Sequence, residues 1–168
     1  TVFNLLGPLT NPAGANAQVI GVSSESFTEP LARVLAELGT LRAFVVHGAD
    51  GLDEISNTGP SRISEVREGS VRNSTVRPED FGLARASIQD LRGGDRTENA
   101  AIIRGILAGE VGPRRDIVLM NAAAALLVGG LAHDLKDGVA LAARSIDSGA
   151  AATKLEGLIA LSRRLATE

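Results

Sequence analysis

The sequence contains no cysteine, tryptophan or tyrosine, and only four phenylalanines. Without cysteine the chain can form no disulfide framework and do no thiolate chemistry, a composition that suits the cytoplasm. With so few aromatic side chains, we expect no platform on which nucleic-acid bases could stack. The formal net charge of −3 offers no basic surface for nucleic acid or for an anionic membrane. No apolar run approaches the roughly 20 residues that a membrane-spanning helix needs.

The chain has the length and composition of one globular domain. It has 168 residues, of which 44% are hydrophobic and 22% charged, enough apolar material for a core and too little charge for a disordered protein. No internal repeat or low-complexity linker divides it. It opens with Thr1 in the middle of apolar residues, without a signal peptide, so we expect a fragment of a longer protein.

The first part of the chain predicts a βαβ unit. A short β-prone run over 18–22, a helix over 28–38 and a continuous apolar strand over 43–46 follow one another. Thr28 is the expected N-cap of the helix, because Pro30 then falls in the first turn, where its missing N–H costs nothing. The helix carries a stripe of apolar residues at core-facing spacing: Leu31, Val34, Leu35 and Leu38.

The rest of the chain predicts a hairpin followed by helices. Strands over 62–66 and 70–76 are expected to turn at Glu68-Gly69. Asp95, with Glu98 three residues later, has the spacing of a capping box. Pro113 suits the first position of a helix that is apolar nearly all round, and Asp134 is a plausible cap for the next. A last helix carries Leu155, Leu158, Ile159 and Leu165. The predicted fold class is therefore α/β, with a βαβ-containing sheet flanked by helices.

The loop after strand 43–46 carries two adjacent carboxylates, Asp53 and Glu54. Ligands of open α/β sheets bind just outside the carboxyl ends of the strands, which is where this loop begins. Carboxylates suit Mg²⁺, which keeps several waters and takes a few carboxylates plus substrate phosphates. Successive strand residues point to opposite faces, so both can serve one metal only outside regular strand geometry or through water. The residues alone leave open a magnesium site and a solvated acidic turn.

Four other polar features have a structural interpretation beside a functional one. His47 can act in acid–base chemistry or hydrogen-bond the backbone. Gly93-Gly94-Asp95 resembles a phosphate loop, but Asp95 would itself occupy the anion position as a cap. Asn121, the odd polar residue of an apolar helix, is expected to tie that helix to a neighbouring loop. Residues 114–116 are expected to form the solvated end of the same helix. No catalytic triad, zinc spacing, P-loop or dinucleotide fingerprint is present.

Several motifs, in order along essentially the whole chain, resemble anthranilate phosphoribosyltransferase. The matching segments are Thr1-Val2-Phe3-Asn4-Leu5-Leu6-Gly7-Pro8-Leu9-Thr10-Asn11-Pro12, Val45-Val46-His47-Gly48, Gly51-Leu52-Asp53-Glu54-Ile55-Ser56, Gly93-Gly94-Asp95, Glu98-Asn99-Ala100 and Asn121-Ala122-Ala123-Ala124-Ala125-Leu126. The resemblance implies the C-terminal part of the nucleoside phosphorylase/phosphoribosyltransferase catalytic domain. It also implies Mg²⁺-dependent transfer of a phosphoribosyl group from phosphoribosyl pyrophosphate to anthranilate in tryptophan biosynthesis.

The same resemblance implies that Asp53 and Glu54 are metal ligands and that the whole enzyme is a cytoplasmic homodimer. It assigns no catalytic side chain to these 168 residues. The family's Gly-Thr-Gly-Gly-Asp pyrophosphate loop, its Lys-His-Gly donor loop and its anthranilate-binding arginine are absent from them. The helical N-terminal domain is absent too. Residues 1–168 therefore correspond to the C-terminal part of the α/β catalytic domain, and the main substrate-binding determinants are expected upstream of Thr1.

Two other functions share the expected fold. One is a pyrimidine nucleoside phosphorylase, against which the Gly-Leu-Asp-Glu sequence of residues 51–54 argues. The other is a non-catalytic DNA-binding paralogue, which would need a basic groove that a net charge of −3 does not indicate.

Overall fold

A four-stranded sheet is the frame of the molecule, for which a computed structural model describes residues 7–166. The strands are β1 (Ala17–Gly21), β2 (Arg42–Gly48), β3 (Ser61–Arg67) and β4 (Ser70–Val76), in the spatial order β1-β2-β3-β4. β1 and β2 are parallel, whereas β3 is antiparallel to both β2 and β4. The predicted βαβ unit and hairpin are confirmed, with strand ends moved by at most two residues.

β2 is buried on both faces, which explains its unbroken apolar sequence. Phe44 and Val46 pack on one side against α4 (Pro113–Val128), in a cluster with Met120 and Ala124. The alternate residues of β2, Ala43 and Val45, belong to the cluster on the opposite face. That cluster is formed with α2 (Thr28–Glu37) and contains Leu31 and Leu35. Successive strand residues point to opposite faces, so a strand between two helical layers must be apolar at every position.

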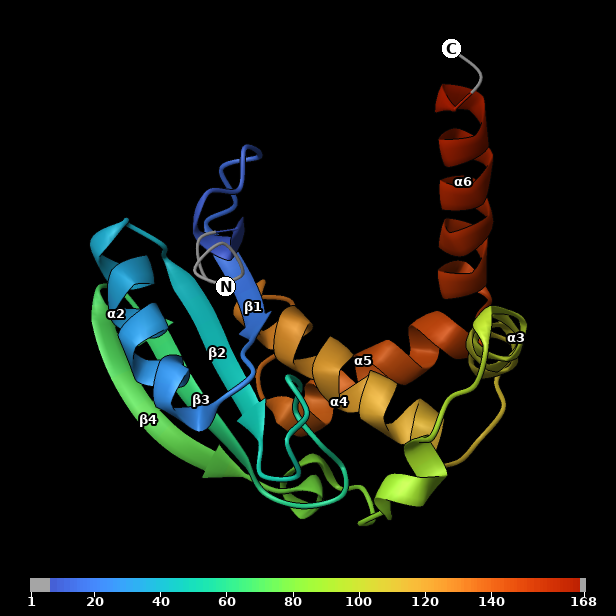
Figure 1. Cartoon of the computed structure of the whole chain (residues 1–168), viewed down its shortest axis with the longest axis horizontal. Helices are drawn as coiled ribbons and strands as arrows, with labels where there is room; N and C mark the ends of the chain where they lie inside the picture. The colour runs from blue at the N-terminus through green and yellow to red at the C-terminus, as the bar shows by residue number, and fades with distance from the viewer. Residues whose placement is uncertain (1–6, 167–168) are drawn as a thin grey trace.

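The remaining elements are short 3₁₀ turns and helices. Four 3₁₀ turns are η1 (Gly7–Leu9), η2 (Glu25–Phe27), η3 (Pro78–Phe81) and η4 (Ile88–Leu91), and three further helices are α3 (Arg96–Leu107), α5 (Leu135–Asp147) and α6 (Ala150–Leu165). In Figure 1 the sheet and α2 form one arm of a U, α4 and α5 its base, and α6 the other arm. The opening of the Phe-Asn-containing motif, residues 1–6, lies outside the described residues.

The local start and stop signals of the sequence are confirmed. The Asp95 carboxylate accepts hydrogen bonds from the N–H groups of Thr97 and Glu98, and the Glu98 carboxylate accepts one from Asp95 N. Pro113 is the first residue of α4, and Asp134 caps α5 by accepting from Asp137 N. Glu68 and Gly69 turn the hairpin with φ of 50° and 77°, the left-handed geometry that matches strand twist.

Two expectations for α2 are wrong. Thr28 is the first residue of α2 rather than its N-cap, because η2 runs directly into the helix. Its buried hydroxyl donates backwards to Glu25 O instead (2.8 Å). Val34 and Leu38 are 38% and 61% exposed, since Ala32 takes the place beside Leu31 and Leu35 against the sheet.

The expectation of a solvated first turn of α4 is wrong for Arg115. This side chain is 8% exposed, and its guanidinium donates to Gly109 O (3.0 Å) and to the Asp147 carboxylate (2.8 Å). Arg114 also donates to a backbone carbonyl, that of Arg92. A buried charge is tolerated only when it is paired and hydrogen-bonded, and Arg115 uses its charge to join α4 to α5.

α6 contributes no buried residue, although its sequence carries apolar positions at helical spacing. Leu158, Leu161 and Leu165 are 63%, 44% and 58% exposed. Figure 1 shows the helix projecting away from α3 and α5, with its far end free. None of the helices within residues 7–166 is long and apolar enough to cross a membrane.

Candidate functional site

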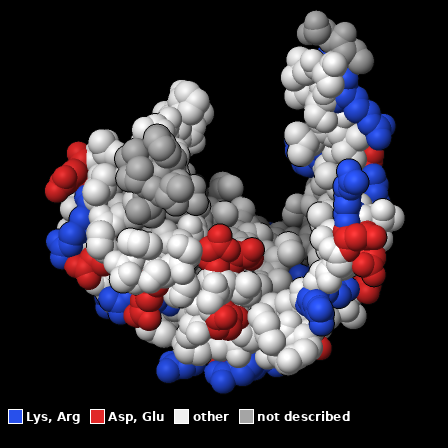
Figure 2. All heavy atoms as spheres, viewed as in Figure 1, with Lys and Arg blue, Asp and Glu red and all other residues white. Residues whose placement is uncertain are grey.

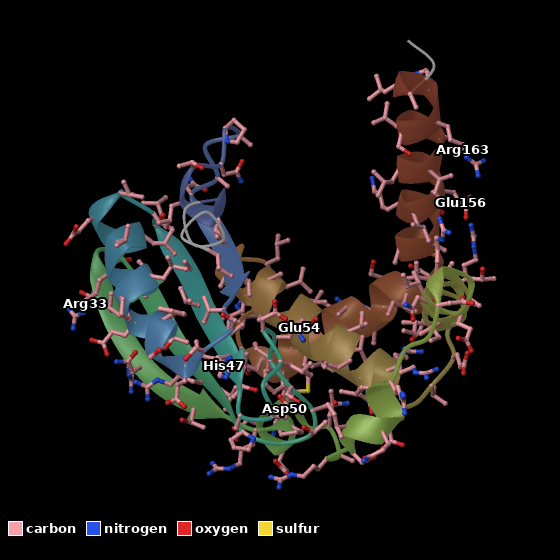
Figure 3. All side chains as sticks on the ribbon, viewed as in Figure 1. Arg33, His47, Asp50, Glu54, Glu156 and Arg163 are labelled. Atoms are coloured by element: carbon pink, nitrogen blue, oxygen red, sulfur yellow. The ribbon has the colours of Figure 1, made fainter. Side chains whose placement is uncertain are left out.

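The candidate site is the β2–β3 loop, residues 49–60. It leaves β2 at Gly48, and because β1 runs parallel to β2, the carboxyl ends of both strands lie at this edge of the sheet. Asp53 and Glu54 lie in irregular backbone within the loop, outside any strand or helix. The predicted position of the two carboxylates, at the carboxyl edge and away from regular strand geometry, is therefore confirmed. Figure 3 shows Glu54 on the side of the loop facing the middle of the molecule, with Asp50 below it.

The Asp50 side chain accepts hydrogen bonds from three other residues of this loop. One carboxylate oxygen accepts from the hydroxyls of Ser56 and Thr58 (2.5 Å each), and the other accepts from Leu52 N (3.1 Å). Burial raises the pKa of Asp50, but the hydrogen bonds from Ser56, Thr58 and Leu52 outweigh it, so the net effect holds the pKa below its usual range. Asp50 thus closes the loop around residues 53 and 54, and its own oxygens are already used within the loop.

Gly21, the last residue of β1, lies directly behind Asp53. A Cβ atom added at Gly21 would be 1.6 Å from the Asp53 carbonyl oxygen and 2.7 Å from its carbonyl carbon. Only glycine lets two backbone segments approach this closely. The end of β1 therefore sets the position of the Asp53 backbone.

α4 holds the other side of the loop. The Asn121 amide accepts from Ile55 N (3.0 Å) and donates to Ile55 O (2.9 Å), which confirms that this residue ties the helix to a loop. One step further along, Asn57 donates to Pro113 O at the start of α4 (2.8 Å). The residue that follows Glu54 is therefore fixed to a helix 66 positions away in the sequence.

The side chains of Asp53 and Glu54 are exposed in this loop. Within residues 7–166 neither carboxylate has a hydrogen-bond or ion-pair partner. Partial burial, followed by the negative charge of Asp53, raises the pKa of Glu54. Two like charges held together without a partner favour a cation between them. No set of three or more His, Cys, Asp or Glu in the described part of the chain could hold a metal by itself.

The structural interpretations of two other features hold. His47 lies next to the loop, but its Nδ1 is 2.7 Å from Val22 O, so the ring bonds the backbone where β1 ends. Gly93-Gly94-Asp95 forms the cap of α3, as described above. Sequence reasoning missed Asp50 and Gly21. The hydroxyls at positions 56 and 58 could have indicated a carboxylate acceptor nearby, and Gly21 could have been noticed as a glycine ending a β-prone run.

We expect Gly21→Ala to displace the loop and destabilise the fold. The added methyl group would have to push the Asp53 backbone away, and overpacking of this kind costs about 1–3 kcal/mol, or more where backbone must move. Urea unfolding measures the loss. Gly59→Ala in the same loop is the matched control, because its Cβ would meet nothing within 4 Å. Equal stability of the two variants would contradict the close approach at Gly21.

Comparison with known proteins agrees with this architecture. Residues 1–152 match the family described as "Glycosyl transferase family, a/b domain". The chain is 55% identical over 163 residues to the anthranilate phosphoribosyltransferase of Syntrophotalea carbinolica, covering 97% of this chain and 46% of that protein. It is 57% identical over 160 residues to that of Moorella thermoacetica, covering 95% and 47%. The chain thus spans about half the length of the curated relatives it matches.

Solved structures give the same result. The anthranilate phosphoribosyltransferase of Thermus thermophilus superposes with a TM-score of 0.87 at 46% identity, over 97% of this chain and 48% of that one. The Saccharomyces cerevisiae enzyme in complex with PRPP and Mg superposes with a TM-score of 0.80 at 30% identity, over 93% and 45%. By sequence and by fold, the chain belongs to the glycosyl transferase family defined by this a/b domain, and within it is homologous to about half of anthranilate phosphoribosyltransferase.

Proposed function

We propose that residues 1–168 are the C-terminal α/β part of a cytoplasmic anthranilate phosphoribosyltransferase. The whole enzyme would transfer a phosphoribosyl group from phosphoribosyl pyrophosphate to the amino group of anthranilate, and would act as a homodimer. The observation that supports this most directly is the pair Asp53 and Glu54, unpartnered among the described residues at the carboxyl edge of the sheet. The similarity to a yeast enzyme bound to PRPP and Mg supports it independently.

The residues present fit a magnesium ion. Asp53 and Glu54 supply hard oxygen donors, and Mg²⁺ is typically bound by one or two carboxylates together with waters and substrate phosphates. Burial is the main cause of the raised pKa of Glu54 and the negative charge of Asp53 adds to it; a dication would offset both. Asp50 is not offered as a ligand, because its oxygens already accept from Ser56, Thr58 and Leu52.

The proposed reaction requires no covalent bond between the substrate and a side chain of residues 1–168. Breaking the anomeric C–O bond builds positive charge on the ribose and negative charge on the departing pyrophosphate. Mg²⁺ held by Asp53 and Glu54 would stabilise that negative charge without any proton transfer. The task of this chain's own residues is then to hold two carboxylates at a fixed place on the sheet edge, through the contacts of Gly21, Asp50 and Asn121. No general acid or base is proposed among them.

The remaining substrate contacts are proposed to lie outside this chain. The pyrophosphate loop, the donor loop and the anthranilate-binding arginine of the family have no counterpart in the 168 residues. We propose that they belong to a preceding half, which also carries the helical domain. We propose no nucleic-acid or membrane partner. On the face seen in Figure 2, basic side chains lie along the lower edge, and at the left edge and on the α3 and α6 side they lie beside acidic ones.

A substrate assay on the full-length protein tests the reaction class. We expect loss of anthranilate fluorescence that requires both phosphoribosyl pyrophosphate and Mg²⁺. A parallel assay supplies inorganic phosphate with uridine or thymidine, the substrates of the alternative pyrimidine nucleoside phosphorylase. Release of free pyrimidine base without anthranilate consumption would contradict the proposal and support that alternative.

A further inference from the structure

Asn121 makes an unusually complete contact with the candidate site. Its side-chain oxygen accepts from Ile55 N, while its NH₂ group donates to Ile55 O and to Ile117 O of its own helix (3.0, 2.9 and 3.0 Å). An asparagine amide has two N–H donors, and both are used here. The side chain therefore pairs with both polar groups of one residue and is itself anchored to α4.

α4 gives this contact a rigid base. Met120, Ala123 and Ala124, on the turn that carries Asn121, are fully buried in the cluster beneath the sheet. The Ile55 side chain is fully buried in the same cluster. Both the backbone and the side chain of Ile55 are thus fixed against one helix. Interiors packed in this way have few alternative arrangements, so the position of Ile55 is well determined.

The fixed position of Ile55 bears directly on Glu54, to which it is peptide-bonded. Gly21 sets the Asp53 backbone from one side, and Asn121 sets Ile55 from the other. The Asp53–Glu54 pair lies between these two points. Adjacent side chains diverge in a regular strand, so bringing two successive carboxylates to one ion requires a defined irregular backbone. Binding groups of a site must be held by neighbours that are themselves fixed.

We propose that Asn121 is a positioning residue for the Asp53–Glu54 cation site. It acts through Ile55, without touching the ion, by holding the backbone that orients Glu54. This inference rests on the proposed function, because it takes the two carboxylates to be ligands of a divalent cation. Groups that orient metal ligands change metal affinity by about 10- to 100-fold when they are removed, and we expect a loss in that range for Asn121.

The experiment measures Mn²⁺ binding to the full-length protein by electron paramagnetic resonance of the free ion, with thermal unfolding followed in parallel. Asp53→Asn with Glu54→Gln defines which binding belongs to the site. Asn121→Ala removes the contact. Asn121→Asp keeps an acceptor for Ile55 N but removes both donors, and it serves if the alanine variant folds poorly. Val128→Ala is the matched control, because this side chain is buried in the same cluster on the same helix, about two turns beyond Asn121.

We expect both Asn121 variants to bind Mn²⁺ at this site about 10-fold or more weakly. Val128→Ala should lower the unfolding temperature and leave Mn²⁺ affinity unchanged. Wild-type affinity in Asn121→Ala or Asn121→Asp would overturn the positioning role while leaving the site assignment intact. Equal losses of affinity in Val128→Ala and the Asn121 variants would show a general effect of stability and overturn it too. Identical Mn²⁺ binding by the wild type and the Asp53/Glu54 double variant would instead overturn the cation site itself, and this inference with it.

Discussion

Asp53→Asn combined with Glu54→Gln is expected to slow Mg²⁺-dependent phosphoribosyl transfer by about 10²-fold or more in the full-length enzyme. Both substitutions keep side-chain shape and remove the charge. The departing pyrophosphate would then lose a dication held against it, and a loss of about 3 kcal/mol of leaving-group stabilisation already corresponds to that factor. The fold should survive, because the two carboxylates are exposed and have no partner within the described residues.

The measurement is a Mg²⁺ titration of the initial rate at saturating phosphoribosyl pyrophosphate and anthranilate, with the unfolding temperature recorded for each protein. Glu37→Gln combined with Glu68→Gln is the matched control. It also removes two negative charges, but from exposed positions away from the loop. A general electrostatic effect would appear in both double variants. Wild-type kinetics in the Asp53/Glu54 variant at every Mg²⁺ concentration would show the pair to be a solvated acidic turn.

The sequence predicted those parts of the fold that depend on local chemistry. Asp95 with Glu98, and Pro113 at the start of α4, are signals in which the cap and the helix lie within one turn of each other. The Glu68-Gly69 turn is equally local, because only the two central residues must adopt positive φ. The unbroken apolar run of β2 predicted burial on both faces, since periodicity reports how many sides of a strand are covered.

What could not be predicted depends on residues distant in the chain. The burial of Arg115 depends on its pairing with Asp147, which lies 32 positions away, and nothing in the residues around Arg115 indicates that partner. The exposure of Val34 follows from the exact rotation of α2 on the sheet, which a pattern of apolar positions fixes only to within one row.

The candidate site divides in the same way. The Asp53–Glu54 pair and its place after a strand could be predicted from the sequence, because the loop directly follows the strand. The close approach of Gly21 to Asp53 brings the end of β1 against the β2–β3 loop, and Asn121 contacts Ile55 across 66 positions. For Asn121 the sequence indicated that a partner must exist, since a polar side chain in an apolar helix needs one. It could not indicate which residue that partner is.

Two uncovered surfaces of the chain are expected to be packed against the rest of the longer protein that we propose. α6 carries three leucines that are 44–63% exposed and no buried residue. β1 has only β2 beside it among the described strands, so one of its edges is unpaired. Exposed apolar faces and open sheet edges are usually covered in a folded protein. Relatives about twice as long as this chain have the material to cover both.

The 168-residue chain alone is therefore expected to form no phosphoribosyl-anthranilate, and to associate or aggregate through its uncovered surface. Holding two reactants in the right geometry can supply about 7–11 kcal/mol of barrier reduction, and this chain lacks the family's pyrophosphate loop and anthranilate-binding arginine. What it retains is the Asp53–Glu54 pair, proposed above as one side of a cation site, which should bind metal weakly without turnover, because Mg²⁺ relies on substrate phosphates to complete its coordination.

Adding a separately expressed N-terminal half, taken from the Moorella thermoacetica relative that is 57% identical in the matched region, should restore turnover. The assay follows anthranilate fluorescence for each half alone and for the mixture. The control mixes the same N-terminal half with the chain carrying Asp53→Asn and Glu54→Gln, which should assemble but turn over about 10²-fold or more slowly. Size-exclusion chromatography separates failure to assemble from failure to react. Turnover by the 168-residue chain alone would show that residues within it orient both substrates. It would overturn the proposal that the other substrate contacts lie in a preceding half.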